Sequence, residues 1–161
     1  MLNKRNSDGS INMLWSQGHN INGVDVSPYI DNFKEQVEDD IWPAVSALLD
    51  RNYLTVTSCQ GHTFYDSAFV TVSFPSEQIA DKFISLVEDL VIYAEYDYSI
   101  TSTTSRLNTL FLKDYNEYYH VRVGVLQYPA AINFLIWPLR KYFINYLTAK
   151  FKKLPNYELI Y

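Results

Sequence analysis

The spacing of hydrophobic residues along the chain switches several times between a helical period and strict alternation. Four segments with helical spacing predict amphipathic helices: residues 29–41, 44–50, 76–90 and 131–152. Alternating or aromatic-rich segments predict five strands: residues 11–15, 53–58, 68–74, 91–100 and 117–128. Pro43 fits only the first turn of a helix, so we expect a break near residues 40–42, and Pro138 predicts a kink in the last helix.

The order of these elements favours an α+β fold, because helices separate pairs of strands without strict alternation. We expect a mostly antiparallel sheet with two to three packed helices, in a ferredoxin-like split β-α-β layout with an added C-terminal helix. No linker-like stretch divides the chain, which predicts a flexible N-terminus over residues 1–10 and a single domain over residues 11–161. The length of 161 residues, 48% of them hydrophobic, suffices for a core.

Charge is unevenly distributed within a net charge of −5. Residues 1–100 carry five Lys and Arg against fifteen Asp and Glu, whereas residues 101–161 carry eight against three. The overall balance makes nucleic acid an unexpected partner. We expect the acidic run Glu38, Asp39 and Asp40 to lie on a solvated helix face. Five cations predict a basic face on the last helix: Arg140, Lys141, Lys150, Lys152 and Lys153.

The location expected from the sequence is the cytoplasm. Cys59 is the only cysteine, so no intramolecular disulfide is expected. The chain shows neither the apolar core of a signal peptide nor a window of about 18 apolar residues that could span a bilayer, so no membrane partner is expected.

The segment Thr57-Ser58-Cys59-Gln60-Gly61-His62 is the strongest candidate site, because loops at strand ends commonly carry functional groups. The tripeptide Gln-Gly-His of this segment also occurs at residues 17–19. We therefore expect a ligand pocket edged by residues from three places in the chain: Cys59, Gln60, Gly61, His62, His19, His120 and Arg122.

Several chemistries are compatible with this segment. Cys59 and His62 could bind Zn²⁺ with His19, His120 or Asp66, but only half of a zinc motif is visible, so neither a metal nor a cofactor is assigned. Cys59 could act as a nucleophile with His62 as its base, although signatures of cysteine hydrolases are absent. Gly61 could simply permit a tight turn.

Recognition of a ligand without chemistry requires the fewest coincidences. Backbone N–H groups of the loop and nearby tyrosines suit a small polar or nucleotide-like ligand. The chain also lacks the phosphate-binding, dinucleotide-binding, metalloprotease and serine-hydrolase motifs of large enzyme classes. We therefore expect binding rather than catalysis. A third hypothesis is an interaction surface, formed by the basic helix or by tyrosines: Tyr93, Tyr96, Tyr98, Tyr115, Tyr118 and Tyr119.

The segment from Tyr53 to His62, followed by the strand Phe69 to Phe74, resembles small uncharacterised accessory proteins of T-even-type bacteriophages. This resemblance implies a role in host takeover or anti-defence in the host cytoplasm, through a host protein or a nucleotide-like signal. It implies no catalytic residues. Ser58, Cys59 and Gly61 are also similar to the Ser-Ser-Cys-Ser-Gly-Arg segment of wybutosine-synthesis methyltransferases, but Gln60 and His62 depart from that pattern.

Overall fold

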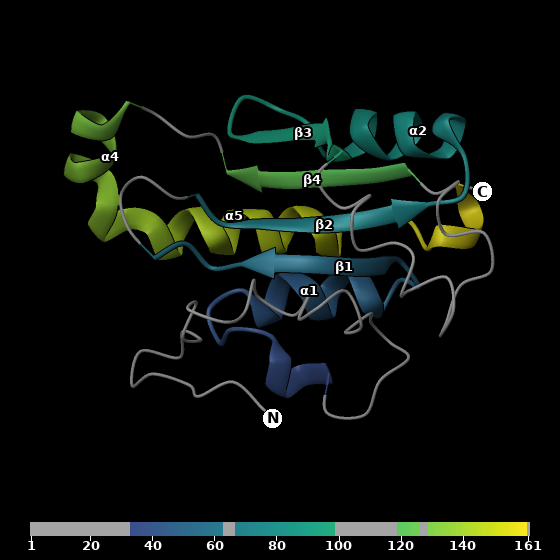
Figure 1. Cartoon of the computed structure of the whole chain (residues 1–161), viewed down its shortest axis with the longest axis horizontal. Helices are drawn as coiled ribbons and strands as arrows, with labels where there is room; N and C mark the ends of the chain where they lie inside the picture. Colours follow the sequence, from purple (N-terminus) through teal and green to yellow (C-terminus); the bar gives the residue numbers. More distant parts are fainter. Residues whose placement is uncertain (1–32, 63–66, 99–118, 126–128, 161) are drawn as a thin grey trace.

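We describe the protein from a computed structural model, which defines residues 33–62, 67–98, 119–125 and 129–160. Four strands form one antiparallel sheet in the order β1-β2-β4-β3 (Figure 1). Their bounds are Leu54–Cys59 for β1, Phe69–Phe74 for β2, Ile92–Tyr96 for β3 and Tyr119–Val125 for β4. The α-helices among the described residues are α1 Trp42–Leu49, α2 Glu77–Val87, α4 Ala130–Ile136 and α5 Arg140–Lys152. The same residues include the short 3-10 helices η1 Phe33–Gln36, η4 Trp137–Leu139 and η5 Tyr157–Leu159.

This arrangement confirms the α+β class and the antiparallel sheet. Strands β2 and β3 are both antiparallel to β4, which lies between them, so they run parallel to each other. Helix α2 connects β2 to β3 in sequence and contacts all three strands. The described sheet thus contains a split β-α-β unit.

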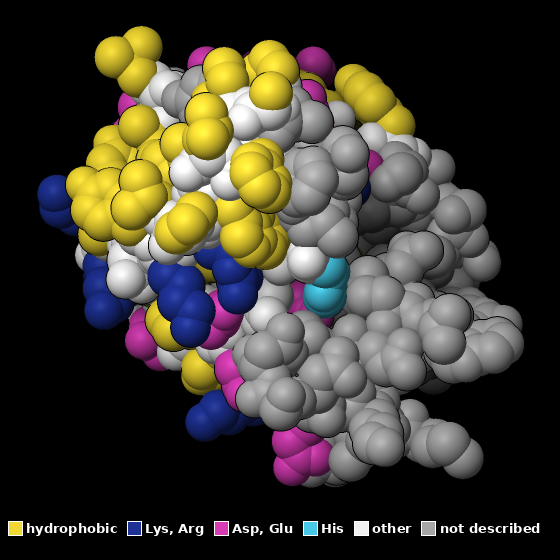
Figure 2. Space-filling view, turned by 90° about the vertical axis from the view of Figure 1, so that its left-hand side faces the viewer, with side chains coloured by type: hydrophobic (Ala, Val, Ile, Leu, Met, Phe, Trp, Pro, Cys, Tyr) yellow, Lys and Arg dark blue, Asp and Glu magenta, His cyan; other side chains and the backbone are white. Residues whose placement is uncertain are grey.

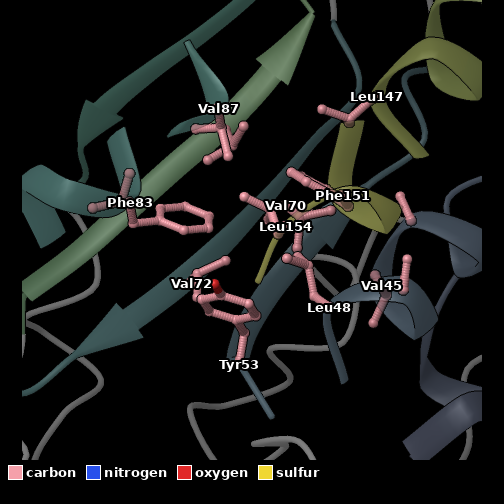
Figure 3. Packing of buried hydrophobic residues seen from close by; sticks show 14 of the residues in the cluster. Val45, Leu48, Tyr53, Val70, Val72, Phe83, Val87, Leu147, Phe151 and Leu154 are labelled. Atoms are coloured by element: carbon pink, nitrogen blue, oxygen red, sulfur yellow. The ribbon is translucent and has the colours of Figure 1, made fainter. Parts of the chain in front are cut away.

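One face of the sheet is apolar and carries the core. Val70 lies opposite Val123, and Val72 lies opposite Val121, so the alternating valines of β2 and β4 form one buried surface. Helices α1, α2 and α5 pack on this surface through buried side chains (Figure 3). The alternation in the sequence therefore separates an apolar face that carries the core from a polar face, whose residues Thr71 and Ser73 in β2 are buried as well.

An aromatic group joins the helices to the C-terminal segment. Tyr53, which precedes β1, lies edge-on to Tyr157 and packs against Phe83 of α2. Its hydroxyl donates a 2.8 Å hydrogen bond to the carbonyl of Pro155, and burial raises the pKa of Tyr53 to about 12. The Tyr53 side chain therefore stays neutral while it ties α1 and β1 to the end of the chain.

Several local signals in the sequence are confirmed. Ser76 caps α2, because its hydroxyl accepts a hydrogen bond from the Ile79 N–H. Asn52 adopts a left-handed conformation with φ of 64° after α1. Pro43 occupies the first turn of α1, and Pro138 lies in the 3-10 turn that separates α4 from α5.

The predicted helix over residues 29–41 is wrong in its described part. Residues 33–36 form the 3-10 helix η1, residues 37–41 are not helical, and α1 begins only at Trp42. The expected solvated acidic face is also wrong, because Glu38 is completely buried. Val37 and Ile41 are buried as well, so the helical spacing of this segment reflects burial without a helix. The candidate strand over residues 11–15 lies outside the described residues.

Exposed hydrophobic side chains gather around α4 and the start of α5, on the face that Figure 2 shows. We call this the α4 surface and define it by five residues: Ile132, Phe134, Leu135, Leu139 and Tyr142. Lys and Arg side chains adjoin it (Figure 2). None of the helices in the described part of the chain has the length and apolar character needed to cross a membrane.

Candidate functional site

Two hydrogen bonds join the loop that follows β1 to the segment that precedes α1. The Gln60 backbone N–H donates a 2.8 Å hydrogen bond to Oε2 of Glu38. In return, the Asp40 backbone N–H donates a 3.1 Å hydrogen bond to Oε1 of Gln60. These two bonds hold residues 38–40 in a non-helical path and bring Glu38 beneath the loop.

Gly61 turns the loop back toward the end of β1. Its φ of 80° lies in the left-handed region, which residues with a Cβ rarely adopt. In this conformation the Gly61 N–H donates a hydrogen bond to Sγ of Cys59, at a distance of 3.4 Å. Such an N–H to sulfur contact stabilises negative charge on the sulfur and fixes its orientation.

Three chemically different donor atoms converge at this point: a carboxylate oxygen of Glu38, the sulfur of Cys59 and a ring nitrogen of His62. The three atoms lie within 4.8 Å of one another. Nε2 of His62 lies 3.1 Å from Oε1 of Glu38. We call this group the Glu38–Cys59–His62 cluster.

The contact between His62 and Glu38 is close but not aligned as a hydrogen bond. Although the 3.1 Å separation is that of an ion pair, Nε2 of His62 is buried and has no hydrogen-bond partner among the described residues. Buried polar nitrogens are nearly always satisfied in folded proteins. An unsatisfied ring nitrogen beside a carboxylate is therefore a position where a further atom would bind favourably.

Burial leaves a single edge of the cluster open to solvent. The side chain of Glu38 is 0% exposed and that of His62 is 23% exposed. Cys59 and Gln60 are 7% and 2% exposed. A nucleophilic sulfur must reach its substrate, so the burial of Cys59 disfavours covalent catalysis. The donor set itself, one sulfur, one imidazole and one carboxylate, matches the ligands that Zn²⁺ uses in proteins.

Asp40 connects the same segment to the last helix. Arg140 and Lys141 of α5 lie 3.6 Å and 3.8 Å from the Asp40 carboxylate. Further along α5, Lys150 lies 3.1 Å from Asp89. The basic face expected on this helix is therefore partly engaged by acidic residues from the first hundred, and its exposed members are Lys141, Lys152 and Lys153.

His120 and Arg122 do not join the cluster. Nδ1 of His120 lies 2.6 Å from the Ser73 hydroxyl, and Ser73 pairs with Leu54, at the opposite end of β1 from Cys59. Arg122 donates two hydrogen bonds to Asp97 and stacks over the ring of Phe69. Of the seven residues expected to edge a pocket, the described part of the chain thus brings together Cys59, Gln60, Gly61 and His62, and places His120 and Arg122 elsewhere. His19 and Asp66 lie outside the described residues.

The tyrosine-rich surface is present in part. Tyr96 stacks on Tyr98 and lies edge-on to Tyr119, with ring centroids 6.3 Å apart in both pairs. Tyr93 is half-buried. Tyr115 and Tyr118 lie outside the described residues.

Glu38 is the member of the cluster that the sequence did not indicate. Its neighbours Asp39 and Asp40 made it resemble part of a solvated acidic run. The signal available in the sequence was Pro43, which forces a helix to begin next to it and leaves the preceding residues free to take another path.

Comparisons with protein-family models, with curated proteins and with solved structures find no match to this chain.

Proposed function

We propose that the chain is a binding protein that recognises a small polar ligand at the Cys59–His62 loop. The observation that carries this proposal is the pair of hydrogen bonds between Gln60 and residues 38–40. They hold polar groups in a fixed arrangement before any ligand arrives, which lowers the entropic cost of binding. The setting we propose is that of a phage accessory protein acting in the host cytoplasm.

Burial supports a small ligand at this loop rather than a host protein. Glu38, Cys59 and Gln60 are almost inaccessible to solvent. His62 has the largest exposed fraction of these four side chains. A protein partner would contact little more than that edge, whereas an ion or a small polar molecule could reach the donors behind it.

Native mass spectrometry of the full chain tests this proposal. We expect a small bound species in the wild-type protein and its loss in His62→Ala, with an unchanged melting temperature because His62 is partly exposed. The matched control is Glu88→Gln, an exposed residue after α2, which should keep the species. A species retained by His62→Ala would remove the loop from consideration.

A second candidate function, binding of a partner protein, is favoured by the α4 surface. Large hydrophobic side chains stay exposed there: Phe134 is 64% and Leu135 is 76% exposed. Exposed apolar patches with a polar rim are typical of interaction sites. Because Arg140 and Lys141 lie between Leu139 and Tyr142 in the chain, the partner we propose presents an apolar centre surrounded by acidic groups.

Cross-linking in infected cells, followed by identification of the linked peptides, tests the second candidate. We expect linked peptides to be acidic and to join the chain through Lys141, and we expect Leu135→Ser to abolish the links. His62→Ala should leave these links intact, because the loop and the α4 surface carry separate functions. Links that persist in Leu135→Ser would rule out this surface.

A further inference from the structure

We infer that the small ligand is a divalent transition-metal ion, with Zn²⁺ the best fit, bound by Glu38, Cys59 and His62. This inference rests on the proposed function of the loop and specifies its ligand. It assigns a chemical role to Glu38, which the sequence did not offer as a partner for Cys59 and His62.

The separation of the donor atoms fits one shared ion. Zn²⁺ binds sulfur at about 2.3 Å and nitrogen or oxygen at about 2.0–2.2 Å, so two ligands of a tetrahedral site lie roughly 3.5 Å apart. The donor atoms of Glu38, Cys59 and His62 lie within 4.8 Å of one another without an ion. Shifts of roughly an ångström in the donor atoms would bring them to the spacing of a tetrahedral site, and side-chain rotation can supply shifts of that size.

Backbone groups already orient two of the three ligands. The Gln60 N–H occupies Oε2 of Glu38, which leaves Oε1 on the side of His62. The Gly61 N–H bonds to Sγ of Cys59. Hydrogen bonds of this kind from outside the coordination sphere orient the ligands of metal sites and tune their basicity. Gln60, whose own side chain is fixed by Asp40, is a positioning residue for the site.

Charge balance points in the same direction. A carboxylate of Glu38 and a thiolate of Cys59 would bring two negative charges into a buried position, which is costly unless they are paired or coordinate a metal. A divalent cation would neutralise both charges and would also satisfy the buried nitrogen of His62.

The donor types select the class of metal. Thiolate and imidazole favour zinc and similar transition metals, whereas Mg²⁺ and Ca²⁺ prefer oxygen ligands. The described residues offer three ligands, so a tetrahedral ion would take its fourth from water or from a further small molecule at the exposed edge of His62. The site is thus expected to bind one ion and to accept an exchangeable ligand on it.

Metal titration of the full chain is the test. The protein is first stripped with a chelator and then titrated with Zn²⁺ alone and with Co²⁺ alone, with stoichiometry measured by native mass spectrometry. We expect one ion per chain and, with Co²⁺, the absorption band of a sulfur-to-cobalt charge transfer. Cys59→Ser should remove that band, and Glu38→Gln and His62→Ala should each weaken Zn²⁺ binding by at least about 100-fold.

Control variants and alternative outcomes keep the test decisive. Glu88→Gln should bind Zn²⁺ as the wild type does. Circular dichroism of the stripped proteins reports whether each variant folds. His62→Ala should disturb the fold least of the three site variants, because His62 is the least buried of the three residues. Zn²⁺ binding unchanged in all three site variants would overturn the assignment. A wild-type chain that binds no Zn²⁺ but carries an organic ligand, lost in His62→Ala, would overturn the metal and leave the proposed function standing. Binding of neither would overturn both.

Discussion

Gln60 and Glu38, 22 residues apart in sequence, are joined by a 2.8 Å hydrogen bond from the Gln60 backbone N–H to the Glu38 carboxylate. The Gln60 side chain in turn accepts from Asp40. The loop and the segment before α1 therefore form one unit, whose parts cannot be altered independently.

Replacement of Gln60 tests this unit. Gln60→Ala leaves the partly buried Asp40 N–H without its acceptor, so the free energy of unfolding should fall by about 1–2 kcal/mol. Zn²⁺ affinity should fall by about 10–100-fold, as for other residues that orient metal ligands. Denaturant unfolding and metal titration measure the two effects. Gln60→Met keeps the length of the side chain but removes the acceptor oxygen, so it should lose stability and Zn²⁺ affinity as Gln60→Ala does; wild-type values in Gln60→Met would count against this role.

His120 should make stability depend on pH. Burial lowers the pKa of His120 to about 4, against an opposing effect of Asp97. The unfolded chain has a histidine pKa near 6.5, so between about pH 6.5 and pH 4 it binds a proton that the folded chain does not bind. The stability present above about pH 6.5 should be lost as the pH falls toward 4, by up to about 3 kcal/mol.

Urea unfolding across this pH range checks the prediction. His120→Gln keeps a group that can bond to Ser73 but does not titrate, so its stability should change less between about pH 6.5 and pH 4. Parallel curves for the two proteins would show that His120 is not the responsible group.

Asp89 should also make stability depend on pH, in a more acidic range than His120. Burial favours the neutral form, but this is outweighed by hydrogen bonds from the Val91 and Ile92 N–H groups, the Tyr146 hydroxyl and Lys150, which lower the pKa of Asp89 to about 2. The contribution of ionised Asp89 to the free energy of unfolding is present above about pH 4 and is lost as the pH falls toward 2. We expect Asp89→Asn to cost about 1–2 kcal/mol at neutral pH and progressively less in acid.

Thermal unfolding of Asp89→Asn and wild type at several pH values measures that difference. Asp50→Asn, at an exposed position after α1, is the matched control and should leave stability unchanged. A cost that stays constant down to about pH 2 would contradict the ionic origin of the effect.

Gly124 of β4 should tolerate no side chain. A Cβ at this position would lie 2.6 Å from the Ala68 carbonyl oxygen and 2.9 Å from the Tyr93 ring. The Ala68 carbonyl accepts a hydrogen bond from the Val125 N–H, so it cannot move away freely. We expect Gly124→Ala to lower stability by about 1–3 kcal/mol. Unfolding in urea would show this, and Tyr93→Ala in the same chain should relieve only part of it.

The fold was predictable where burial follows a simple period. Val70 and Val72 alternate with polar residues because they face the core, and the same is true of Val121 and Val123, so these strands could be read from the sequence. Pro138 likewise marks a break whose cause is local. Both signals arise from neighbours in the chain.

Of the three residues in the cluster, only the two that are close together in the sequence could be predicted. Cys59 and His62 follow a strand end, which the pattern indicated. Glu38 reaches them through a contact over more than 20 residues, which no local period encodes, and Val37 and Ile41 imitated a helix because both are buried. His120 was placed correctly on a strand, but its pairing with Ser73 depends on the register of β2 and β4.

The position of β4 between β2 and β3 governs the order in which the sheet can be completed during synthesis. The described strands β2 and β3 do not pair with each other, so both keep an open edge until residues 119–125 are made. Nascent chains that stall before this point would display a valine-rich edge to other chains, which invites aggregation. Because β4 is the last of the described strands in the chain, closure of the sheet is a late step of folding, and α5, which follows β4, then completes the core.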